Sequence, residues 1–168
     1  MLVAVSACAG TSKARYEDPT KAAASSAKPG KKQPIFPMTL SAKLTCKDVV
    51  ERDTVVEPLE ETNTFKSSDR QVVAFVAFDH IVKTDKVKVK QAKSLRWKWY
   101  APSGELYAES KSMDIAAKGP YHLRLTAYHA INVAGEKAST LPGEWHVIVE
   151  VDDTPAVNVP FKIERTFS

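Results

Sequence analysis

Residues 144–163 read EWHVIVEVDDTPAVNVPFKI, and this stretch decides the fold. Apolar side chains occupy every second position on both sides of Asp152-Asp153, which is the period of a β-strand with one buried face. The aspartates and the proline that follows them favour a tight turn. The stretch therefore predicts a β-hairpin. Its apolar residues are Trp145, Val147, Val149 and Val151 before the turn and Val157, Val159, Phe161 and Ile163 after it.

The same alternation recurs in short segments upstream of the hairpin, each bounded by turn residues. Residues 71–80 (QVVAFVAFDH) are more densely apolar than the others, which is typical of a central strand buried on both faces. Pro102-Ser103-Gly104 predicts a tight turn between two of the segments. The further predicted strands are residues 40–46, 95–100, 105–110 and 121–131.

Strand segments spaced near ten residues apart, with no long helical period between them, indicate one all-β domain. We predict an antiparallel β-sandwich of about seven strands over residues 38–168. Burying a tryptophan ring removes about 150–250 Å² of surface from water. Trp99 and Trp145, which are in phase with the apolar residues of their strands, are therefore expected in the core. Cys46 is expected to be a small buried hydrophobe.

The N-terminus resembles a lipoprotein processing site. Val5-Ser6-Ala7-Cys8 is similar to the lipobox of bacterial lipoproteins, in which small residues precede a cysteine that is acylated. The resemblance implies that residues 1–8 are the end of a signal peptide and that lipid on Cys8 holds the chain to a membrane. Ala9, in place of an aspartate, is similar to the sorting pattern of outer-membrane lipoproteins and implies a domain that faces the periplasm. The alternative is a cytoplasmic chain with Cys8 as a free thiol in a frayed terminus.

Residues 9–37 differ in composition from the rest of the chain. They are rich in Ala, Ser, Lys, Gly and Pro and have few large apolar side chains to bury, so they cannot offset the entropy lost on ordering. We predict a flexible linker with a reach of about 30 Å. Six basic and two acidic residues in this linker account for the whole net charge of +4. The domain itself is neutral, which argues against nucleic-acid binding.

The sequence lacks the common catalytic motifs. It has no P-loop, no G-x-G-x-x-G, no H-E-x-x-H, no G-x-S-x-G and no C-x-x-C. His122 and His146 could lie on the outward faces of neighbouring strands, but no third ligand accompanies them. We therefore predict no catalytic residue, no metal and no cofactor.

Two features could carry binding. Lys86, Lys88 and Lys90 alternate along an extended segment. They could dock an acidic partner or an anionic glycan, although an edge strand protected by lysines is the simpler interpretation. Tyr100 and Tyr128 are out of phase with the apolar residues of their strands. On adjacent strands they could form a platform for sugar rings or a protein, and the alternative is two scattered exposed side chains.

Residues 41–164 resemble a known class of domain. The features are Cys46 in the first strand, Phe65, the WKWY motif at residues 97–100, and the closing segments LPGEWHVIVEV and VPFKI. They are similar to immunoglobulin-like or fibronectin-like β-domains of uncharacterised bacterial envelope proteins, which implies this fold and an envelope location. The function we expect is a non-catalytic, lipid-anchored accessory module that binds another envelope protein. The alternative is a module that binds a glycan or a small ligand.

Overall fold

Ten β-strands and one short 3-10 helix make up the part of the chain that the computed structural model describes, which is residues 18, 38–52, 55–80, 93–115 and 124–166. Seven of these strands have seven or more residues, and three are shorter. The elements are β1 (Met38–Arg52), β2 (Val55–Glu61), β3 (Thr64–Lys66), β4 (Gln71–His80), β5 (Lys93–Tyr100), β6 (Leu106–Glu109), β7 (Met113–Ile115), β8 (Arg124–Asn132), η1 (Lys137–Thr140), β9 (Gly143–Val151) and β10 (Thr154–Glu164).

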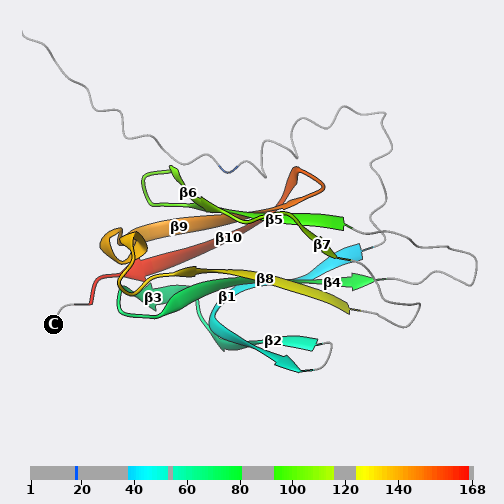
Figure 1. Ribbon diagram of the computed structural model, residues 1–168, viewed down its shortest axis with the longest axis horizontal. Helices are drawn as coiled ribbons and strands as arrows, with labels where there is room; N and C mark the ends of the chain where they lie inside the picture. Colours follow the sequence, from blue (N-terminus) through cyan, green and yellow to red (C-terminus); the bar gives the residue numbers. More distant parts are fainter. Residues whose placement is uncertain (1–17, 19–37, 53–54, 81–92, 116–123, 167–168) are drawn as a thin grey trace, which may run out of the picture.

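The strands form two sheets that face each other (Figure 1). Sheet A has the order β2-β1-β4-β8, and sheet B has the order β3-β10-β9-β5-β6, with β7 also paired to β5. The described strand pairs are antiparallel except for β3 and β10, which run parallel. The predicted all-β, immunoglobulin-like sandwich is therefore confirmed.

The hairpin β9–β10 has the form that its sequence predicts. Val151 lies opposite Thr154, so only Asp152 and Asp153 form the loop. Their φ angles are 50° and 60°. Two positive φ angles in a two-residue loop are the mark of a type I′ turn, whose twist matches that of the flanking strands. Aspartate tolerates this left-handed conformation better than most residues because its short polar side chain can hydrogen-bond locally.

Aromatic rings fill the core between the two sheets. Trp97, Trp99 and Trp145 each have an exposed fraction of 0%. The ring of Phe161 lies 5.9 Å from the rings of both Trp99 and Trp145, and 5.8 Å from that of Phe65. The prediction that Trp99 and Trp145 fill the core is confirmed, and Trp97 is buried with them.

A bulge in β1 places Cys46 on the outer side of sheet A. Leu40 lies opposite Phe78, but Ala42 lies opposite Ala77, so the strand changes face between the two. Beyond the bulge, Cys46 lies opposite Val73 of β4. The residues of β4 on either side of Val73 are buried on both faces of the sheet, as predicted. Cys46 is itself fully buried and free, and burial raises the pKa of its thiol to about 11. The thiol therefore stays protonated and unreactive at neutral pH.

Candidate interaction surface

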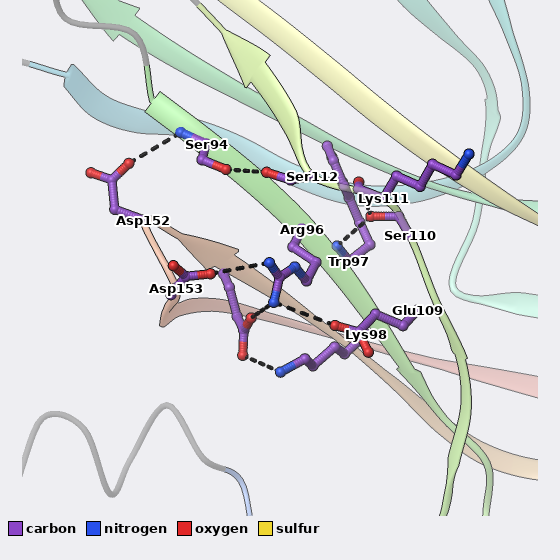
Figure 2. A network of polar contacts seen from close by, with 11 residues as sticks. Ser94, Arg96, Trp97, Lys98, Glu109, Ser110, Lys111, Ser112, Asp152 and Asp153 are labelled. Carbon is purple, nitrogen blue, oxygen red and sulfur yellow. Dashed lines mark hydrogen bonds and ion pairs between the residues drawn. The ribbon is translucent and has the colours of Figure 1, made fainter.

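A network of ion pairs covers part of the outer face of sheet B (Figure 2). Every second residue of β5 is buried in the core, so the intervening Arg96 and Lys98 point outward. Glu150 of β9 lies opposite Arg96 in the ladder. One carboxylate oxygen of Glu150 is 2.7 Å from the Nζ of Lys98, and the other is 3.9 Å from Nη1 of Arg96. The hydrogen bond to Glu150 raises the pKa of Lys98.

Arg96 extends this network to two further elements. Its Nη1 atom lies 3.6 Å from Oε1 of Glu109 on β6, and its Nη2 atom lies 3.2 Å from Oδ1 of Asp153 in the β9–β10 turn. The side chain of Asp153 is 77% exposed, so this pair contributes little to stability. The side chain of Glu150 is only 9% exposed. The positive charges of Lys98 and Arg96 therefore offset the cost of removing its carboxylate from water. The network joins β5, β6, β9 and the turn, and its charges are paired with one another.

Serine hydroxyl groups hold the strands beside this network. The hydroxyl of Ser110 accepts a hydrogen bond from the amide of Trp97 at 3.0 Å and donates one to the carbonyl of Lys111 at 2.9 Å. The hydroxyls of Ser94 and Ser112 are hydrogen-bonded to each other (Figure 2). These bonds lie where the partner of β5 changes from β6 to β7. These hydrogen bonds position the strands, and the amide of Ser94 also donates one of 3.1 Å to Oδ1 of Asp152.

The structure separates Tyr100 and Tyr128, the two tyrosines that could have formed a platform. Tyr100 lies on β5 of sheet B, whereas Tyr128 lies on β8 of sheet A. The expectation that they lie on adjacent strands is wrong, because each points away from a different sheet. Tyr128 donates a hydrogen bond from its hydroxyl to Glu51 at 2.7 Å, which ties β8 to the end of β1 across β4 and raises the pKa of Tyr128.

Several other residues singled out from the sequence lie outside the described residues. These are Cys8, Lys86, Lys88, Lys90 and His122. Of the linker at residues 9–37, Asp18 is described. His146 is described on β9, where its Nδ1 lies 3.3 Å from Oδ1 of Asn158. Within the described part of the chain, no three His, Cys, Asp or Glu side chains lie close enough together to hold a metal ion.

His129 is a core-facing side chain that no sequence motif singled out. It lies on β8, in phase with the buried Leu125 and Ala127, and so enters the core from sheet A. Its Nδ1 accepts a hydrogen bond of 3.0 Å from Nε1 of Trp99, and its ring stacks on Trp97 at a centroid distance of 6.1 Å. Desolvation lowers the pKa of His129. The period-two pattern of β8 could have revealed this residue, because it follows Leu125 and Ala127 at the same spacing.

The neutral imidazole of His129 predicts a pH-dependent stability. Protonation would place a proton on Nδ1, which now accepts the Trp99 hydrogen bond. Above a pH of about 6.5 the residue is neutral in both folded and unfolded chains and has no effect. As the pH falls below that value, the unfolded chain binds the proton more readily, so the free energy of unfolding should decrease by up to about 1.4 kcal/mol per pH unit until the folded pKa is passed.

Urea unfolding at pH values between about 7.5 and 5 measures this loss. The matched variant is His129→Asn, whose side-chain oxygen can still accept a hydrogen bond but does not titrate. We expect the slope of stability against pH to be smaller in the variant. An equal slope in the two proteins would place the effect on another histidine.

A shallow groove of about 350 Å³ runs between β1 and β10, where the two sheets meet at one side of the sandwich. The Nζ of Lys43 donates a hydrogen bond of 3.3 Å to the carbonyl of Asn158 across this side. Pro160, which has no N–H group, lies two residues further along β10. A lysine and a proline at a strand edge discourage the pairing of further strands. The groove is lined by Lys43, Leu44, Thr45, Glu61, Thr62, Asn63, Asn158, Val159 and Pro160.

Among the described elements, no helix is long and apolar enough to cross a membrane.

Comparison with known proteins finds matches of low sequence identity among solved structures. No protein-family model matches the chain, and no curated protein matches it in sequence. The alkylpurine DNA glycosylase AlkC of Pseudomonas fluorescens, solved with DNA that contains an abasic-site analogue, is 9% identical with a TM-score of 0.47. That match covers 76% of this chain but only 30% of the glycosylase chain. An immunoglobulin-like protein of Pseudomonas aeruginosa is 13% identical with a TM-score of 0.42, and the match covers 76% of this chain and 96% of that one.

Proposed function

We propose that this chain is a non-catalytic, lipid-anchored accessory module of the bacterial cell envelope, in which the β-sandwich binds another envelope protein. The observation that carries the proposal is the lipobox-like sequence Val5-Ser6-Ala7-Cys8 ahead of a basic segment and a neutral domain. Lipid on Cys8 would hold the chain at a membrane, and the basic residues that follow would add about 1 kcal/mol each near anionic head groups.

Membrane fractionation of a Cys8→Ala variant tests the anchor. Expressed behind a lipoprotein signal peptide, the wild-type chain should be found in the membrane fraction and the variant in the soluble fraction, because the variant has no thiol to acylate. Cys46→Ala is the matched control, since it removes the other cysteine and should leave fractionation unchanged. In a host with two membranes we expect the wild type in the outer membrane. Equal membrane retention of the wild type and the Cys8 variant would contradict lipid anchoring.

The groove between β1 and β10 favours a second candidate function, the binding of a glycan or small ligand. Its volume of about 350 Å³ is at the lower end of the range of ligand pockets. Its lining includes the polar residues Thr62, Asn63 and Asn158. Titration with soluble oligosaccharides, followed by the amide resonances of these three residues, distinguishes the two functions. Saturable shifts there would favour the ligand-binding module over the protein-binding one.

A further inference from the structure

Asp18 makes a contact with the sandwich that no feature of the sequence predicts. Its Oδ2 accepts a hydrogen bond of 2.6 Å from Nδ2 of Asn158, a residue 140 positions away. Asn158 lies on the outer face of β10, since Val157 and Val159 on either side of it are buried in the core. Asp18 therefore meets the outer face of sheet B at this point.

The surroundings of Asn158 suit an acidic residue. The side-chain oxygen of Asn158 lies 3.3 Å from Nδ1 of His146, which orients the amide so that its NH₂ group is directed to Asp18. The Nζ of Lys43 donates a hydrogen bond of 3.3 Å to the backbone carbonyl of the same asparagine. Hydrogen bonds that involve a charged partner are about twice as strong as neutral ones.

The same face is covered beside Asn158. Ile148 lies between Lys98 of β5 and Asn158 of β10 in the ladder and points outward, because Val147 and Val149 face the core. An isoleucine in such a position is normally open to water, but Ile148 is only 1% exposed. The outer face of sheet B is therefore buried at Ile148 and not open to water.

We propose that the N-terminal segment docks at Asp18 on the outer face of sheet B, so that sheet B faces the membrane and the free tether is short. The orientation rests on the proposed lipidation of Cys8, whereas the docking does not. Asp18 lies ten positions after Cys8 in the sequence, and Met38 lies thirty positions after it. A flexible chain of ten residues has a reach of about 16–19 Å, against about 30 Å for thirty. Docking would therefore hold the sandwich close to the lipid surface with one face inward.

Paramagnetic relaxation enhancement in the full-length chain tests the docking. The protein carries Cys8→Ser, so it is not lipidated, and Cys46 is buried and will not take up a label. One sample has a nitroxide at Lys162→Cys, on the outer face of β10, and the other at Arg124→Cys, on the outer face of sheet A. We expect the first label to weaken the amide resonance of Asp18 at least fivefold more than the second. Equal weakening would overturn the docking, because a free segment samples both faces.

Removal of the hydrogen-bond donor supplies the matched control. Asn158→Ala should make the two labels affect Asp18 equally, and Asn132→Ala, an exposed asparagine on β8, should leave the difference intact. A difference that survives Asn158→Ala would show that Asn158 does not hold the segment.

The orientation is tested with the lipidated chain on vesicles that contain a headgroup-labelled quencher. A fluorophore at Lys162→Cys should be quenched at least twofold more than one at Arg124→Cys. Equal quenching in the vesicle-bound protein would overturn the orientation while leaving the docking result unaffected. A chain that fails to acquire lipid would be recognised beforehand by fractionation, which separates the failure of the anchor from that of the docking.

Discussion

Replacing Trp145 by alanine is expected to lower the free energy of unfolding by about 3–5 kcal/mol, the range found when a buried Trp or Phe is truncated. The side chain has an exposed fraction of 0%, and its ring lies 5.1 Å from that of Tyr107 and 5.9 Å from that of Phe161. Its Nε1 donates a hydrogen bond of 3.0 Å to the carbonyl of Leu141, next to the turn that begins β9. Since domains of this kind are stable by about 5–15 kcal/mol, such a loss is enough to unfold a marginal one. Equilibrium urea unfolding of the full chain measures it.

Two further variants separate the ring of Trp145 from its hydrogen bond. Trp145→Phe keeps most of the apolar surface but leaves the Leu141 carbonyl without this donor, so a loss of about 1–3 kcal/mol is expected. Leu106→Ala removes a side chain that is 50% exposed and should cost less than about 0.5 kcal/mol. A Trp145→Ala protein as stable as the Leu106→Ala protein would show that the ring does not fill the core in solution.

Local patterns were sufficient to predict the strands and the fold class. The hairpin at residues 144–163 follows from alternation and from a turn sequence, and both depend only on neighbouring residues. The bulge in β1 marks the limit of such patterns. Leu40 and Cys46 are in phase in the sequence, yet the bulge puts Leu40 opposite the core residue Phe78 and Cys46 opposite Val73 on the other face of β4.

Sheet membership could not be predicted, because it depends on contacts between distant segments. The phase of Tyr100 and Tyr128 indicated that both point outward, but not that β5 and β8 belong to opposite sheets. The partners of Glu150 and Asn158 were hidden for the same reason. Lys98 is 52 residues from Glu150, and Asp18 is 140 residues from Asn158. The alternation within a predicted strand shows which of its side chains share a face. To predict which side chains form one surface, the order of the strands in the sheet must also be known.

The second large effect is expected at Trp99, where alanine should also lower the free energy of unfolding by about 3–5 kcal/mol. The ring of Trp99 is fully buried and lies 5.9 Å from that of Phe161. It differs from Trp145 in its polar partner, since its Nε1 donates to the imidazole of His129. The truncation would therefore leave both a cavity and an acceptor without this donor, and urea unfolding measures the combined loss.

Trp99→Phe provides the control, because it keeps an aromatic ring and removes only the hydrogen bond. We expect a smaller loss of about 1–3 kcal/mol together with a rise in the pKa of His129, since a hydrogen bond donated to Nδ1 favours the neutral imidazole. An NMR titration of the His129 ring protons follows the second effect. A cavity alone would lower the free energy of unfolding without changing the pKa of His129. An unchanged His129 pKa in Trp99→Phe would mean that the hydrogen bond does not keep the imidazole neutral. The fall in stability with pH would then arise from desolvation of the ring between Trp97 and Trp99.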